Sequence, residues 1–174
     1  ESFPDTGVEL VPMDFSPLFE LAALLYEGPW VAERHAAVGE FISSHPDDVN
    51  PVVAGIIGQA VGRTATETFK AMYRKEALLK AIDTAFAGVD GLLVPTAPKA
   101  PTQAQVAADP VVANSQMGTY TNFVNLADMS ALSVPAGFRR DGLPFGITLI
   151  SGAWKDGELQ VLAAEWLNRQ PTPL

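Results

Sequence analysis

Residues 131–151 read ALSVPAGFRRDGLPFGITLIS. Two strand-like runs, 131–138 and 145–151, lie in this stretch and are rich in apolar and β-branched residues. Asp141-Gly142 stands between them, and an Asp-Gly pair favours a tight turn because glycine adopts positive φ angles without steric cost. The stretch therefore predicts a β-hairpin, around which the other elements are placed.

Elements on both sides of the hairpin combine helices with a further strand. A helix is predicted at 156–169, where Leu159, Leu162 and Trp166 share one face. An apolar strand is predicted at 91–95, and the proline-rich segment after it predicts a loop that leaves the edge of a sheet. A short helix is predicted at 118–127. The pattern indicates the α/β fold class.

The N-terminal half reads as mainly helical. After a short strand at 8–11, Ser16 is predicted as an N-cap with Pro17 at the first helical position, and Gly28-Pro29 ends that helix near residue 26. A second helix is predicted at 30–44 and a long one at 50–86. Three glycines at 55, 58 and 62 weaken its first half, and they either admit a closely packed element or mark a break.

Composition and charge exclude several classes of protein. The 174 residues are 48% hydrophobic, contain no cysteine and carry a formal net charge of −9. A nucleic-acid binder needs a basic face to neutralise phosphates, so no nucleic-acid partner is predicted. No apolar run is long enough to span a bilayer, and an acidic chain gains nothing at an anionic membrane surface. We expect a cytoplasmic location and no membrane partner.

The sequence lacks the common self-contained catalytic motifs. It has no Gly-rich phosphate loop, no helical His-Glu pattern for zinc and no Gly-x-Ser-x-Gly nucleophile elbow. Of its two histidines, His45 precedes a proline at a predicted helix end, where a capping or solvated role is expected. We therefore predict no cofactor, no metal and no catalytic residue in this chain.

Arg34 is the most unusual residue of the chain. Its helical neighbours three and four positions away are Trp30, Val31, Ala37 and Val38, so it lies within an apolar stripe. A buried guanidinium needs an anion or several carbonyl partners. The structural alternative is a buried ion pair with an acid elsewhere, or a side chain that extends to water.

Tyr26, Asn122 and Asn125 are further candidates for a small-molecule site. Tyr26 ends the helix before the Gly28-Pro29 break, and a phenol beside an arginine could help to hold a small carboxylate. Asn122 and Asn125 belong to a segment rich in Asn and Thr, which could line a pocket. The alternatives are core packing for the tyrosine and capping of loop backbone for the asparagines.

Several stretches together resemble the amidase-signature family. The signature-like stretches are 125–137 (NLADMSALSVPAG), 141–150 (DGLPFGITLI) and 90–98 (DGLLVPTAP). Asp128, Ser130 and Thr148 depart from the family's usual Gly, Pro and Gln. These departures, with LYEGPWVAER at 25–34 and GTYTNFVN at 118–125, are similar to the allophanate hydrolase branch.

The resemblance implies a fold, an activity and a role for two residues. Residues 1–174 would form the C-terminal part of an amidase-signature domain, with a mixed β-sheet flanked by helices. The family's Ser–Ser–Lys triad would lie in an N-terminal catalytic half that this sequence does not contain. Tyr26 and Arg34 match positions that bind the substrate, the small anionic amide allophanate (urea-1-carboxylate). The remaining part of the domain and a second copy in a homo-oligomer are the expected protein partners.

Two other hypotheses compete with this one. The chain could belong to another amidase branch, such as a biuret-type hydrolase or the A-type subunit of an amidotransferase that acts on charged tRNA. The acidic charge weighs against tRNA, and the segment from Tyr26 to Arg34 weighs against both of these branches. Alternatively, the missing nucleophile would suit a non-catalytic module. An upstream Gly/Ser-rich segment with a lysine would exclude that possibility.

Overall fold

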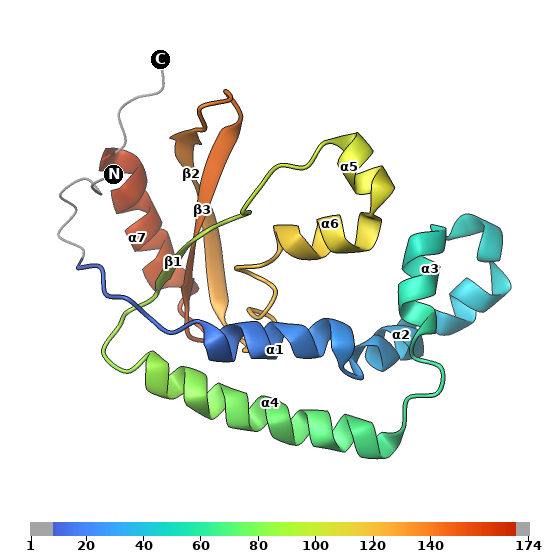
Figure 1. Ribbon diagram of the computed structural model, residues 1–174. Helices are drawn as coiled ribbons and strands as arrows, with labels where there is room; N and C mark the ends of the chain where they lie inside the picture. The colour runs from blue at the N-terminus through green and yellow to red at the C-terminus, as the bar shows by residue number, and fades with distance from the viewer. Residues whose placement is uncertain (1–8, 170–174) are drawn as a thin grey trace.

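The computed structural model describes residues 9–169, which form helices and a small sheet (Figure 1). The helices are α1 (Ser16–Glu27), α2 (Trp30–Ser44), α3 (Pro51–Gly58), α4 (Ala65–Ala85), α5 (Gln103–Ala108), α6 (Pro110–Met117) and α7 (Asp156–Arg169), with a 3-10 turn η1 (Pro46–Asp48). The strands are β1 (Leu92–Pro95), β2 (Ser130–Phe138) and β3 (Pro144–Ser151).

The three strands form an antiparallel sheet in the order β1-β3-β2. The predicted hairpin is β2–β3, and Gly142 in its turn has φ +81°, which glycine tolerates without strain. The backbone N–H of Arg139 donates to the carbonyl of Leu143 across this turn at 2.8 Å. The predicted hairpin, the strand at 91–95 and the α/β fold class with a sheet flanked by helices are confirmed.

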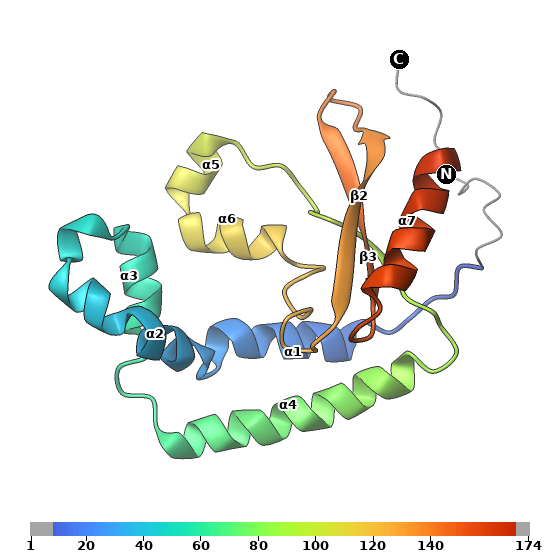
Figure 2. The ribbon, with the colours of Figure 1, turned by 180° about the vertical axis from the view of Figure 1, so that it is seen from behind.

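Two apolar clusters cover the two faces of this sheet. On one face, α7 packs against β2 and β3 through Leu159 and Ala163 (Figure 2). On the other face, α1 and α4 lie against β1 and β3, and Phe123 is fully buried between them. Alternation along β3 produces this division, because Ile147 and Leu149 face α7 whereas Ile150 faces the opposite cluster.

The prediction of one continuous helix over 50–86 is wrong. The chain forms α3 and α4, separated by turns in which Gly62 has φ +93°. Thr64 then starts α4 with a capping box: its hydroxyl accepts from the Glu67 N–H at 3.2 Å, and the Glu67 carboxylate accepts from the Thr64 N–H at 2.8 Å. The glycines therefore mark a break in the helical pattern, which is the second of the two alternatives given for them above.

The capping box predicts a lowered pKa for Glu67. The Thr64 backbone N–H, and then its hydroxyl, donate to the carboxylate and lower its pKa below the ordinary 4.5. The ionised carboxylate therefore stabilises the fold above the unfolded-state pKa, and this contribution is lost as pH falls through the folded pKa. Thr64→Ala, which removes the hydroxyl donor, should raise the pKa part of the way to 4.5 in an NMR titration. A wild-type value of 4.5 or above would contradict the capping box.

The prediction of a helix over 118–127 is also wrong. This segment consists of successive turns, in which the N–H groups of Thr121 and Asn122 both donate to the Gly118 carbonyl at 2.9 and 2.8 Å. Glycine, threonine and asparagine are weak helix formers, so local turns are favoured there. The helices α5 and α6 lie just upstream instead, and Asp109 caps α6 before Pro110.

The remaining helix predictions agree with the structure to within a residue or so, whereas the strand predicted at 8–11 does not form in the described residues. The helices predicted at 30–44 and 156–169 are α2 and α7. Helix α1 begins at Ser16 with Phe15 as its N-cap, and the Asp14 carboxylate accepts from the Ser16 N–H at 2.9 Å. In the predicted strand at 8–11, residue 8 lies outside the described residues and residues 9–11 form no strand.

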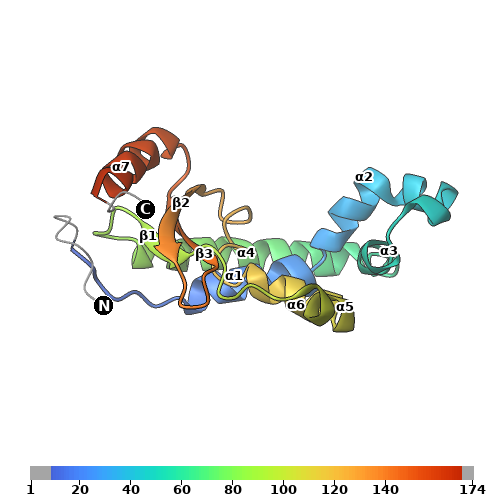
Figure 3. The ribbon, with the colours of Figure 1, turned by 90° about the horizontal axis from the view of Figure 1, so that it is seen from above.

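Helices α2 and α3 extend away from the sheet, as the view from above shows (Figure 3). We call residues 30–63 the helical arm. Several of its apolar side chains are exposed, including Val38, Phe41, Val53 and Val61, of which Val61 is 77% exposed, whereas Val31 and Ile57 are buried. The break between α1 and α2 sets the direction of the arm and lies next to two of the predicted site residues.

Candidate functional site

Tyr26 and Arg34 lie on either side of the Gly28-Pro29 break. Tyr26 is in the last turn of α1, Arg34 is in the second turn of α2, and both are half-buried. The Gly28 N–H donates to the Leu24 carbonyl at 2.9 Å, and a Cβ at position 28 would come within 2.3 Å of that oxygen. Only glycine therefore fits at position 28. The Gly28-Pro29 turn joins α1 directly to α2, so Tyr26 and Arg34 lie on consecutive helices.

Among the described residues, no acidic side chain forms an ion pair with the Arg34 guanidinium. Within residues 9–169, the structure shows no ion pair and no hydrogen bond for Arg34 or for the Tyr26 hydroxyl. The structure thus shows no ion pair between Arg34 and an acid of residues 9–169. Arg34 is half-buried, and its five guanidinium N–H donors are available for an external carboxylate or for water.

Asn122 and Asn125 lie in the turn segment 118–128, between α6 and β2. Aromatic contacts of Tyr120 with Phe15 and Phe19 hold this segment against the start of α1. Tyr26 is seven residues beyond Phe19, about 10 Å further along the helix axis. The segment with the two asparagines therefore lies against the start of α1, whereas Tyr26 lies at the end of that helix.

The two asparagines differ in their surroundings. Asn122 is half-buried and folds back over Gly118, and its side-chain amide makes a long contact of 3.5 Å to the Ser115 carbonyl. Asn125 is exposed, and its backbone carbonyl accepts from the Asp128 N–H at 3.3 Å. The contact of Asn122 is the kind expected from a residue that satisfies loop backbone, whereas the Asn125 side chain extends into open space.

Two residues that depart from the family pattern contact or flank the start of α7. The Ser130 hydroxyl is buried, donates to Asp156 Oδ2 at 2.9 Å and accepts from the Lys155 N–H at 3.1 Å. Asp128 adopts φ +53°, in the left-handed region that glycine occupies without strain. A proline at 130 could not make the hydroxyl contacts, so Ser130 ties β2 to α7 in this chain.

Asp128→Gly should stabilise the fold because the left-handed conformation costs an aspartate about 1 kcal/mol. We expect the free energy of unfolding in urea to rise by about 0.5–1 kcal/mol, reduced by the greater freedom of glycine in the unfolded chain. Asp83→Gly, at an exposed site inside α4, is the matched control and should lower stability by about 0.3–0.5 kcal/mol, because glycine is a slightly weaker helix former than aspartate. A loss of stability in Asp128→Gly would contradict this strain argument.

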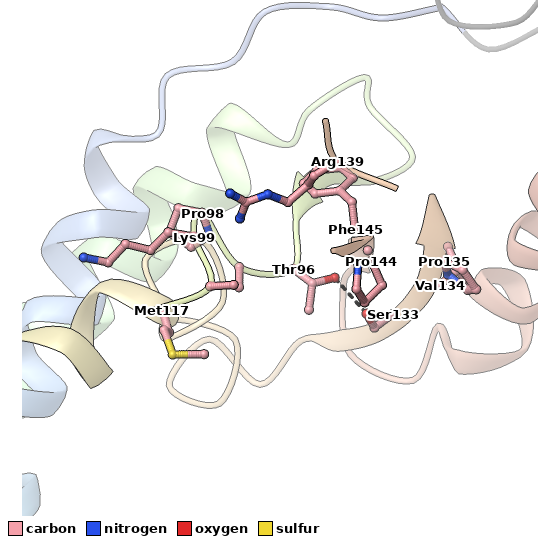
Figure 4. A pocket seen from close by; sticks show the side chains of 13 residues that line it. Thr96, Pro98, Lys99, Met117, Ser133, Val134, Pro135, Arg139, Pro144 and Phe145 are labelled. Carbon is pink, nitrogen blue, oxygen red and sulfur yellow. Dashed lines mark hydrogen bonds between the residues drawn. The ribbon is translucent and has the colours of Figure 1, made fainter. Parts of the chain in front are cut away.

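A groove that the sequence did not predict lies at the end of β1 (Figure 4). Its volume is about 620 Å³, and it is lined by residues 96–100, Met117, residues 133–135 and four residues of the β2–β3 hairpin. At its floor, Thr96 Oγ1 is 2.8 Å from Ser133 Oγ and 2.9 Å from Thr148 Oγ1. Ser133 and Val94 both pair with Thr148 in the sheet, and Thr96 follows two residues after Val94. The three hydroxyls therefore meet at one place.

His45 and Ser44 lie at the exposed end of α2, with Ser44 Oγ 2.8 Å from His45 Nδ1. His45 is the C-cap of α2 and stacks on Phe41, while the Ser44 hydroxyl beside it donates to the Glu40 carbonyl at 2.8 Å. Within residues 9–169 there is no group of three His, Cys, Asp or Glu side chains that could hold a metal ion. No helix in this range is long and apolar enough to cross a membrane.

Comparisons with known proteins agree on one family. The profile of the family described as Amidase matches residues 2–160. Urea amidolyase of Saccharomyces cerevisiae is 48% identical over 170 residues, which are 97% of this chain and 9% of that protein. The A-type subunit of glutamyl-tRNA(Gln) amidotransferase from a Psychrobacter species is 41% identical over 91 residues, covering 52% of this chain and 18% of that protein.

The solved structures agree with the sequence comparison. A Kluyveromyces lactis allophanate hydrolase superposes with a TM-score of 0.89 at 45% identity, covering 93% of this chain and 27% of that one. The chain thus spans well under a third of each of these relatives.

Proposed function

Because this chain belongs to the amidase family, we propose that it is the substrate-recognising part of an allophanate hydrolase, which hydrolyses urea-1-carboxylate and releases ammonia. The observation that carries the proposal is the half-buried residue Arg34, whose guanidinium forms no ion pair with an acid of residues 9–169. Its position in an apolar stripe suits a small anionic ligand. The 48% identity to a urea amidolyase over nearly the whole chain supports this branch of the family.

Arg34 and Tyr26 would recognise the carboxylate end of allophanate. A guanidinium fork donates two parallel N–H bonds to a carboxylate, and the apolar neighbours of Arg34 strengthen this contact by lowering the local dielectric. Tyr26, across the Gly28-Pro29 break, would donate its hydroxyl to the same end of the ligand. Asn122 and Asn125 would form part of the pocket wall. Binding one end of the substrate in this way would present the terminal amide to the catalytic groups.

The bond-breaking groups would come from outside this chain. A serine nucleophile, activated by a second serine and a lysine, would attack the terminal amide carbonyl, so that the C–N bond breaks and ammonia leaves from an acyl-enzyme. Water would then hydrolyse the acyl-enzyme. The chain itself would supply binding and orientation, and alone would be inactive.

The exposed helical arm supports a covering partner. Val38, Phe41 and Val61 are exposed apolar side chains of the arm, and Val38 and Phe41 lie one turn apart on α2, which suits an interface. The remaining part of the amidase domain is the proposed occupant, since the chain spans 27% of the solved allophanate hydrolase. A homo-oligomer and a cytoplasmic location, both expected of the family, stay predictions.

A comparison of substrates tests this function against its alternatives. The enzyme that carries this chain with the rest of its amidase domain should release ammonia from allophanate with a kcat/KM at least about 100-fold above that for biuret or glutamine, because neither presents the same carboxylate to Arg34. A preference for biuret or glutamine would assign the chain to another amidase branch. No amide hydrolysis at all would favour a non-catalytic module.

A further inference from the structure

We propose that the groove at the end of β1 is a binding site for a small carboxylate that also carries an amide group. We call it the β1 groove; its residues are those given above with Figure 4. It shares no residue with the four positions predicted to bind substrate, and the proposal does not depend on the proposed function. It is carried by three features of the groove: its charge, its hydroxyl floor and its size.

The charge of the β1 groove is opposite to that of the whole chain. The sequence has 20 acidic and 11 basic residues, yet Lys99 and Arg139 line the groove and none of its described lining residues is acidic. The Lys99 amino group donates to the neutral side-chain amide of Gln116. Arg139 bonds to Asp141 through Nη2 at 2.8 Å, which leaves other guanidinium N–H donors for a ligand. This local charge favours an anion.

The hydroxyl floor can bond to both ends of an amide. Thr148 is 4% exposed, Thr96 is half-buried and Ser133 is exposed, so the three hydroxyls connect the buried sheet to the groove. The Ser133 hydroxyl donates to the Ile147 carbonyl over a long 3.3 Å. If a ligand displaced the Ile147 carbonyl, the Ser133 hydroxyl could donate to the carbonyl oxygen of the ligand amide. The oxygen lone pairs of Ser133 could accept a hydrogen bond from an amide N–H of the ligand.

The size and lining of the β1 groove suit a small molecule. Pro98, Pro135 and Phe145 provide rigid apolar walls around the hydroxyl floor. The volume of about 620 Å³ lies within the range of small-molecule sites. Lys99 and Arg139 come from separate segments, the loop after β1 and the hairpin, and both line the groove.

Calorimetric titration of the protein with oxamate, a planar amide-carboxylate, tests the β1 groove. The titration is done in an Arg34→Gln background, so that the position proposed for substrate binding is not read out. Binding should persist there and weaken about tenfold when Arg139→Gln is added, which is the loss expected for one charge-assisted hydrogen bond. The neighbouring Arg140→Gln, outside the groove, is the matched control and should change Kd less than about twofold.

A second variant tests the groove without changing a residue of the hairpin turn. Ser133→Ala leaves the Arg139–Asp141 pair intact and should weaken oxamate binding about threefold, with an unchanged circular dichroism spectrum. Equal losses in Arg139→Gln and Arg140→Gln would mean diffuse attraction and would overturn the proposal. So would the absence of oxamate binding in the Arg34→Gln background. Neither result would alter the substrate comparison that tests the proposed function.

Discussion

Arg34→Ala should lower kcat/KM for allophanate by about 100-fold or more in the enzyme that contains this chain. The substitution would remove a guanidinium that has no protein anion within residues 9–169 and would leave the substrate carboxylate without its partner. Loss of one side of a desolvated charge pair costs about 2–5 kcal/mol, and 2.8 kcal/mol is about 100-fold. The measurement is ammonia release over a range of allophanate concentrations.

Two further variants separate recognition from stability. Arg34→Lys keeps the charge but loses the planar fork, so it should recover only part of the activity. Arg63→Ala, at an exposed position between α3 and α4, is the matched control and should leave kcat/KM within about twofold. Unchanged kinetics in Arg34→Ala, with folding intact, would remove Arg34 from the substrate site.

Phe123→Ala should lower the free energy of unfolding by about 3–5 kcal/mol. Phe123 is fully buried between α1, α4 and the sheet, and its ring meets that of Phe15 edge-on at a centroid distance of 6.3 Å. Truncation would remove buried apolar area and leave a cavity that rigid neighbours cannot fill. Because a domain is stable by only about 5–15 kcal/mol, urea unfolding should show a large shift of the midpoint.

Phe138→Ala is the control for this core prediction. Phe138 lies at the end of β2 and is 73% exposed, so its loss should change stability by less than about 0.5 kcal/mol. A loss below about 1 kcal/mol in Phe123→Ala would contradict the placement of the turn segment 118–128 in the main core.

Local signals were enough to predict the hairpin and most helix boundaries. Asp141-Gly142 and Gly28-Pro29 act through backbone conformation within a few residues, and both turns form as predicted. The long helix at 50–86 was wrong because apolar spacing continues across Gly62, while the break depends on its positive φ and on the Thr64 cap. That cap was visible in the sequence as Thr64 followed by Glu67.

Helices α5 and α6 were missed although both carry start signals. Thr102 and Gln105 form a capping box at the start of α5, and Asp109-Pro110 begins α6. The helices are only six and eight residues long, so their apolar periodicity is too short to recognise. The sequence pattern instead predicts a helix in the polar segment 118–127 that follows them.

The candidate site was predictable only in part. Arg34 stands out because its helical neighbours three and four positions away are apolar, and the structure adds that no acid of residues 9–169 forms an ion pair with it. The β1 groove could not be predicted, because Thr96 lies 37 residues from Ser133 and 52 from Thr148. Only the strand register brings these hydroxyls together.

The most direct test is a crystal structure of the enzyme with malonamate, in which CH₂ replaces the central NH of allophanate, in a variant that lacks the serine nucleophile. The proposed function predicts that both oxygens of the malonamate carboxylate lie about 2.7–2.9 Å from the Arg34 guanidinium, with the Tyr26 hydroxyl beside them. A malonamate carboxylate bound elsewhere, with Arg34 paired to an acid of the enzyme, would contradict it.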